Sequence, residues 1–131
     1  MEDTLLIDTD VLVDLLRNKY EIINWFKDNN DKFKFATTII NIFELYTGAY
    51  QSNNEDKEIK NVQDIIDRFI IFNLSLESVE EAGKQRARLE KQGHPLESRD
   101  IFIGSIAVTH NLPLKTNNKK HFERIEGLNL T

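Results

Sequence analysis

Residues Leu5-Leu6-Ile7-Asp8-Thr9-Asp10-Val11-Leu12 join a short apolar run directly to a helical pattern. The uninterrupted apolar run predicts a buried strand over residues 4–7. Asp8, Thr9 or Asp10 can cap the helix that follows over residues 11–16. A strand that is apolar on both faces is typical of a parallel sheet with helices on both sides. This segment therefore predicts the start of an α/β domain.

Strand and helix signals continue to alternate along the rest of the chain, without a linker, repeat or low-complexity tract. We therefore expect one domain over residues 1–131, in the α/β class, with a mostly parallel five-stranded sheet. Further strands are predicted at residues 34–37, 70–74, 114–116 and 128–130, and further helices around residues 22–29, 39–50, 59–69, 78–93 and 98–111.

Composition excludes several classes of protein. Apolar residues make up 40% of the 131 residues and charged residues 30%, which is typical of a soluble globular chain rather than a disordered or membrane one. The chain has no cysteine, which suits a reducing, cytoplasmic environment. The net charge of −5 does not attract nucleic acid to the whole surface. A nucleic-acid role would need a local basic surface or a bound cation.

Acidic residues stand in apolar surroundings at three distant places. Asp8 follows the first strand, Glu44 interrupts an apolar helix, and Asp100 opens the apolar helical run of residues 101–107. Burying a carboxylate is costly unless its charge is compensated, and a divalent cation shared by all three would do so. Ligand crevices in parallel sheets lie at the carboxyl ends of the strands, where Asp8 and residues 116–118 are expected. The pattern predicts a metal-dependent hydrolase.

Each acid also has a purely structural interpretation. Asp8 can cap its helix, Asp100 can be a first-turn acid favoured by the helix dipole, and Glu44 can pair with a buried Arg or Lys. The three histidines lack zinc-like spacing, and the sequence contains no HExxH, Walker A, GxGxxG or GxSxG motif. A metal site built from carboxylates is the chemistry that remains.

Four segments, taken in order, resemble the motifs of the PIN domain family, in particular its VapC toxins: residues 5–12, 37–48, 100–107 and 114–128. The resemblance implies an α/β/α sandwich around a parallel sheet, with Asp8, Glu44 and Asp100 as the catalytic, metal-binding acids. Thr116 would orient the site. The family often has a fourth acid where this chain has Asn118.

The same resemblance implies a Mg²⁺-dependent endoribonuclease, with Mn²⁺ as a possible substitute, that cleaves tRNA or ribosomal RNA and arrests translation. It also implies a cognate VapB-like antitoxin and a homodimer. No membrane association is expected, because no apolar run approaches the length of a bilayer span. Lys115, Lys119, Lys120 and Arg124 are candidates for binding the phosphates of RNA.

Two other functional classes stay open on the sequence. One is a PIN-type nuclease of RNA processing or DNA repair, and the other is a non-catalytic acidic binding module. A partner helix is expected to cover exposed apolar side chains such as Trp25, Phe26 and Tyr50, with a basic partner side chain reaching the acids.

Overall fold

A computed structural model describes residues 3–131 of the chain. Its described part contains one parallel sheet of four strands in the order β3-β2-β1-β4. The strands are β1 (Asp3–Ile7), β2 (Phe33–Thr38), β3 (Ile70–Phe72) and β4 (Leu114–Lys115). The predicted parallel α/β architecture is confirmed, and β1 lies inside the sheet between β2 and β4.

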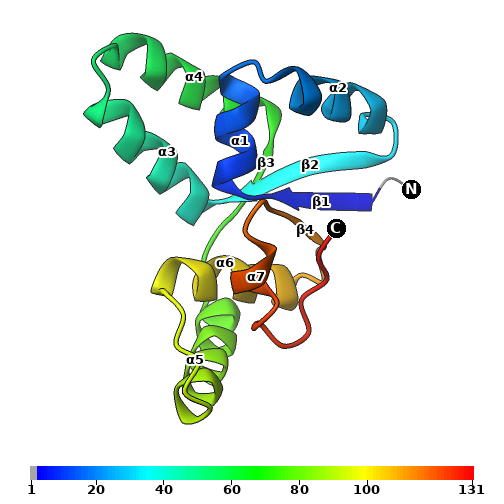
Figure 1. Cartoon of the computed structure of the whole chain (residues 1–131), viewed down its shortest axis with the longest axis vertical. Coiled ribbons are helices and arrows are strands. Elements are labelled where there is room, and N and C mark those ends of the chain that lie inside the picture. Colours follow the sequence, from blue (N-terminus) through cyan, green and yellow to red (C-terminus); the bar gives the residue numbers. More distant parts are fainter. Residues whose placement is uncertain (1–2) are drawn as a thin grey trace.

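Helices cover both faces of the sheet (Figure 1). One side carries α1 (Thr9–Leu16), α2 (Tyr20–Asn29), α3 (Ile39–Gln51) and α4 (Glu55–Arg68). The other side carries α5 (Leu76–Lys91), α6 (Ser98–Thr109) and the short α7 (Lys119–Phe122). No helix among residues 3–131 is both long and apolar enough to span a bilayer.

The side chains of β1 explain why helices lie on both faces. Leu5 and Ile7 belong to the core cluster beneath α1, α3 and α4, whereas Leu6 belongs to the cluster with α5, α6 and α7. All three side chains are fully buried. Alternate residues of a strand point to opposite faces, so a continuous apolar run needs a cover on each side. Each such side chain contributes about 1.5–3 kcal/mol through burial.

The predicted fifth strand is wrong. Within the described residues, the segment 128–130 makes only an isolated parallel bridge between Leu130 and Leu114. Its partner β4 is two residues long, and Gly127, with φ of 84°, turns the chain just before the segment. Too few consecutive extended residues remain on either side to form a ladder. The helix α5 also begins at Leu76, two residues earlier than predicted, because Ser75 caps it.

The ends of β1, β2 and β4 bring distant segments together. Asp8 directly follows β1 and caps α1, while Thr116 directly follows β4. At the end of β2, Thr38 caps α3 in a capping box completed by Asn41. The box fixes the direction of the first turns of α3 and thereby turns Asn41 and Glu44 toward Asp8.

Candidate active site

Asp8 is the buried centre of the polar site, with only 1% of its surface exposed. Its Oδ2 accepts a hydrogen bond of 2.7 Å from Thr116 Oγ1, and its Oδ1 accepts one of 3.0 Å from Asn41 Nδ2. The Thr9 backbone N–H donates to the same Oδ1 at 2.8 Å. Asp8 therefore caps α1, as its structural interpretation predicted, and also joins three segments of chain at the carboxyl ends of the strands.

Arg99, a residue that the sequence did not single out, contacts all three predicted acids. Its Nε and Nη2 donate to the two oxygens of Glu44 at 2.6 and 2.7 Å. Its Nη2 also donates to Asp8 Oδ1 at 3.0 Å, and its Nη1 donates to Asp100 Oδ1. Asp8, Glu44 and Asp100, predicted to share a site, are thus gathered around one guanidinium.

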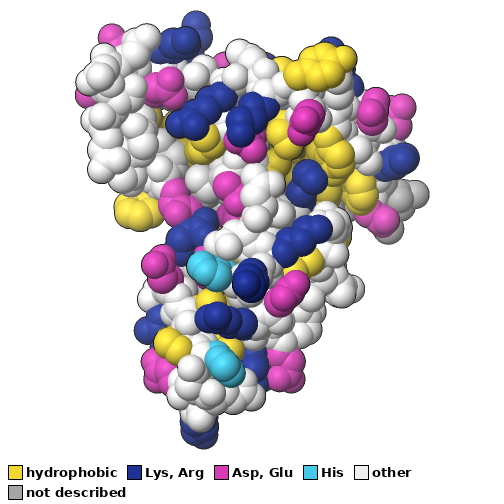
Figure 2. Space-filling view, viewed as in Figure 1, with side chains coloured by type: hydrophobic (Ala, Val, Ile, Leu, Met, Phe, Trp, Pro, Cys, Tyr) yellow, Lys and Arg dark blue, Asp and Glu magenta, His cyan; other side chains and the backbone are white. Residues whose placement is uncertain are grey.

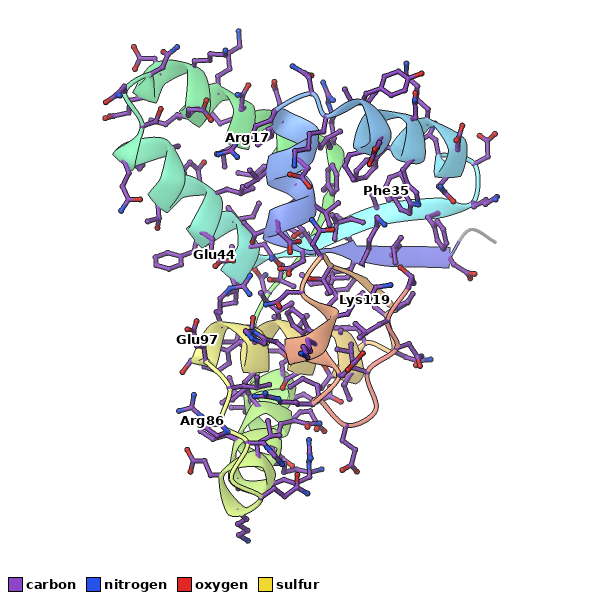
Figure 3. The ribbon with its side chains drawn as sticks, viewed as in Figure 1. Arg17, Phe35, Glu44, Arg86, Glu97 and Lys119 are labelled. Carbon is purple, nitrogen blue, oxygen red and sulfur yellow. The ribbon has the colours of Figure 1, made fainter. Side chains whose placement is uncertain are left out.

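Glu44 and Asp100 reach this point from opposite helical layers. Glu44 lies on α3 at the end nearest β1, facing the region of α6 (Figure 3), and Thr9 Oγ1 donates to it at 2.6 Å. Asp100 is in the first turn of α6 and is 2% exposed. Acidic and basic side chains and a histidine accordingly gather at the waist of the molecule, between the two groups of helices (Figure 2).

Burial and charge act against each other on these groups. Burial raises the pKa of Asp100, helped by the charge of Asp8 and opposed by Arg99. Burial would lower the pKa of Arg99, but the hydrogen bond and charge of Glu44, with the charges of Asp8 and Asp100, outweigh it and raise that pKa. The guanidinium is therefore firmly cationic and acts as the counterion of the cluster.

The closing segment adds Thr116, Asn118 and His121 beside the acids. The Asn118 backbone N–H donates to Thr116 Oγ1 at 3.0 Å, which holds the hydroxyl that binds Asp8. The Asn118 side chain does not touch the three acids but lies 2.9 Å from His121 Nδ1. That nitrogen is 3.4 Å from Asp100 Oδ2. Asn118 is therefore connected to the acids only through Thr116 and His121.

Asp10 is a fourth carboxylate near the cluster, which the sequence indicated only as a helix cap. Its Oδ2 accepts from the Asn117 backbone N–H at 3.1 Å, while its Oδ1 is buried and has no hydrogen-bond partner among residues 3–131. Burial, followed by the charge of Asp8, raises the pKa of Asp10. Asp10 thus adds negative potential to the acidic cluster from the side of α1.

Only some of the four basic residues predicted to bind RNA phosphates are free to do so. Lys115 stacks over the Trp25 ring at 4.3 Å, and burial lowers its pKa. Arg124 donates to the Pro95 carbonyl. Lys119, labelled on α7 in Figure 3, and Lys120 are exposed. Of the four candidates, these two lysines are the better placed to meet a polyanion.

The donor set suits a hard divalent cation. In the described range 3–131, no three carboxylate or histidine groups are spaced to hold an ion as they stand. However, carboxylate oxygens of Asp8, Glu44 and Asp100 all contact one positive group, Arg99. Oxygen ligands of this kind are those that Mg²⁺ prefers. The residues fit a metal ion in the place that the guanidinium takes.

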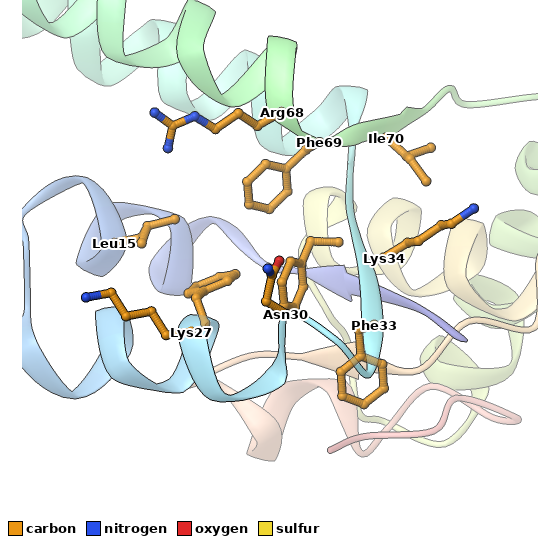
Figure 4. Close-up of a pocket in the computed structure, with 10 residues that line it drawn as sticks. Leu15, Lys27, Asn30, Phe33, Lys34, Arg68, Phe69 and Ile70 are labelled. Carbon is orange, nitrogen blue, oxygen red and sulfur yellow. The ribbon is translucent and has the colours of Figure 1, made fainter. Parts of the chain in front are cut away.

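One cavity adjoins the acids and a second lies away from them. One, of about 370 Å³ between α1, α3 and α4, has Thr9 and Glu44 in its wall and so adjoins the site. The other, of about 680 Å³, is lined by aromatic residues such as Phe33 and Phe69, with Lys27, Lys34 and Arg68 around it (Figure 4). It lies at the starts of β2 and β3, at the opposite ends of the strands from the acids.

A parallel sheet between two helical layers, with carboxylates gathered at the carboxyl ends of its strands, defines an α/β protein with a partly buried acidic cluster. The sequence profile of the PIN domain matches residues 5–128. The chain therefore belongs to the PIN domain family, as the four motifs indicated.

Similar proteins carry VapC names. The chain is 29% identical to ribonuclease VapC2 of Haemophilus influenzae over 124 residues, covering 94% of this chain and 92% of the relative. It is 25% identical to the tRNA(fMet)-specific endonuclease VapC of Shigella flexneri, with coverage of 94% and 92%. The crystal structure of VapBC2 from Rickettsia felis, bound to promoter DNA, superposes with a TM-score of 0.90 at 25% identity over 98% of this chain and 97% of that one.

Proposed function

We propose that this protein is an endoribonuclease toxin of the VapBC type, which hydrolyses phosphodiester bonds of structured RNA with the help of Mg²⁺. The observation that carries the proposal is the convergence of Asp8, Glu44 and Asp100 on one positive group. Asp8 at the N-cap of α1, Glu44 of α3 and Asp100 of α6 come from three distant segments of the chain. The endonuclease name of the Shigella relative makes tRNA the first substrate to test.

Each acid has a distinct role in the proposed reaction. Asp8 and Asp100, both nearly fully buried, would bind the cation directly. Glu44, whose side chain is 26% exposed, would hold a water for attack on the phosphorus. Thr116 keeps Asp8 in one orientation through its 2.7 Å hydrogen bond. The bound cation would lower the pKa of the attacking water and stabilise charge on the phosphate oxygens.

The proposed partners are RNA, a VapB-like antitoxin and a second copy of this chain, all in the cytoplasm. The expected apolar docking residues need correction: Trp25 and Phe26 pack partly buried in the core, because they contact each other and Phe35 edge to face or tilted. Tyr50 is 60% exposed, and Phe43 on the same helix is 68% exposed. Phe43 directly precedes Glu44 and Tyr50 lies six residues after it, and both exposed side chains are proposed to contact the antitoxin.

The direct test of this function combines cleavage with growth. Purified protein should cut tRNA in Mg²⁺ or Mn²⁺ and stop on addition of EDTA, and its expression alone should arrest bacterial growth. Co-expression of the neighbouring small DNA-binding protein should restore growth. Cleavage that persists in EDTA would end the metal mechanism. Harmless expression of a protein that cuts RNA in vitro would replace the toxin with a nuclease of RNA processing.

Asn118→Asp offers a finer test of the edge of the site. The new carboxylate would stand near His121 and, through it, Asp100. Because hard cations gain affinity with ligand charge, the variant should need less Mg²⁺ for half-maximal cleavage and gain more thermal stability from Mg²⁺. Asn118→Ala should lower cleavage only modestly. Magnesium titrations of rate and melting temperature measure both, and a dependence identical to wild type places residue 118 outside the metal site.

A further inference from the structure

Arg99 stands at the mouth of the acidic site rather than sealed inside it. Its side chain is 25% exposed, whereas those of Asp8 and Asp100 are 2% and 3% exposed. It leaves the backbone in the first turn of α6, next to Asp100. The guanidinium is therefore tethered beside the cluster and has solvent on one side into which it can withdraw.

The guanidinium and a divalent cation need the same oxygens. Arg99 takes both oxygens of Glu44, Oδ1 of Asp8 and Oδ1 of Asp100. Two cations in contact repel strongly in a partly buried site. The site therefore holds either the guanidinium or the divalent cation, and Arg99 has to move away from the acids before a metal can be bound by all three.

A displaced guanidinium has an obvious new partner in a ribonuclease. Carboxylate and phosphate both present paired oxygens that match the planar fork of an arginine. The phosphodiester to be cut must lie against the acids, within the reach of a side chain anchored next to Asp100. Of the four other basic residues expected to bind phosphate, Lys115 is engaged with Trp25 and Arg124 with Pro95, which leaves the exposed Lys119 and Lys120 of α7.

We propose that Arg99 is a substrate-binding residue with two positions: it partly compensates the charge of the three acids in the metal-free protein and binds the scissile phosphate once a divalent cation has taken its place. This inference rests on the proposed ribonuclease function. Arg99 then supplies part of the positive charge that the metal-free site needs, and arrival of the cation releases the guanidinium to bind RNA.

The first arm of the test measures Mn²⁺ binding by calorimetry without RNA. Arg99→Gln should bind Mn²⁺ about tenfold more tightly or better, equivalent to about 1.4 kcal/mol, because no guanidinium has to be displaced. Arg99→Lys, which keeps the charge but loses the fork, should lie between the two. Arg86→Gln is the matched control, because Arg86 is an exposed arginine that donates to Ser98. It should bind Mn²⁺ like wild type.

Thermal melts distinguish a change in metal binding from a folding defect. In EDTA, Arg99→Gln should melt below wild type, because three carboxylates lose their counterion, and Mn²⁺ should raise its melting temperature more than that of wild type. Equal Mn²⁺ affinity in wild type and Arg99→Gln would overturn the proposal. If instead wild type and Asp8→Asn bind Mn²⁺ alike, the cation is not held by the acids and the proposed function fails as well.

The second arm measures cleavage at saturating Mn²⁺. Arg99→Gln should show a KM for RNA raised about tenfold or more, as expected for loss of a charged contact to phosphate. Arg99→Lys should recover part of this loss. The control Arg86→Gln should have the same KM as wild type. A KM and kcat unchanged in Arg99→Gln would remove the phosphate-binding role.

Discussion

Asp8→Asn should abolish RNA cleavage while leaving the protein folded. The amide keeps the shape of the side chain and can still accept hydrogen bonds from Asn41 and Thr9, which now hold Asp8 Oδ1. It removes the charge that a cation needs at the most buried point of the site. The loss should exceed the roughly 10–100-fold typical of changes to groups that only support a metal ligand. Initial rates of tRNA cleavage in Mg²⁺ measure it.

The control for this variant is Asp64→Asn, which makes the same chemical change at an exposed position on α4. Circular dichroism and urea unfolding of both variants separate a chemical loss from a folding loss. Cleavage by Asp8→Asn at a rate near that of wild type would show that the acidic cluster is structural only. Parallel purification of all three proteins guards against contaminating ribonuclease.

Phe122→Ala should be among the most destabilising substitutions in the chain. Phe122 is completely buried and packs in the core cluster that joins Leu6 of β1 to Ile103 of α6. Removing a buried Phe side chain costs about 3–5 kcal/mol, because apolar burial is lost and a cavity is left. The variant should also loosen α7 and with it His121, which faces Asp100.

Urea denaturation measures the free energy of unfolding for this variant, with Phe43→Ala as control. Phe43 is 68% exposed, so its truncation should change stability by no more than about 0.5 kcal/mol in the free protein. A Phe122→Ala protein as stable as the Phe43→Ala protein would contradict the packing of α7 against the sheet.

That the three acids lie together could be predicted, because each is a charged residue in an apolar stretch of sequence. Arg99 could not, because an arginine before a first-turn aspartate is indistinguishable from a solvated charge. Only the fold brings residues 8, 44 and 99 together. The structural alternative for Glu44, pairing with an Arg or Lys, is present in the structure, but the sequence did not identify Arg99 as that partner.

The fold was predicted well where long patterns determine it and poorly where short ones do. The predicted start of helix α3 was correct, because Thr38 is a strong cap. The fifth strand was wrong because pairing depends on a partner, β4, that is only two residues long. The aromatic residues of α2 were expected at the surface, yet Trp25 and Phe26 pack against Phe35 of β2, a tertiary contact that helical periodicity does not specify.

The most direct measurement is the crystal structure of the protein soaked in Mn²⁺, with anomalous diffraction to locate the metal. We expect an anomalous peak bound by the carboxylates of Asp8 and Asp100, with Glu44 near it and the Arg99 guanidinium moved out toward solvent. A soaked crystal of Asp8→Asn is the control, and we expect no such peak in it. Wild-type crystals without a peak at the acids, and with Arg99 still bound to all three, would contradict the claim that these residues form a metal-dependent nuclease site.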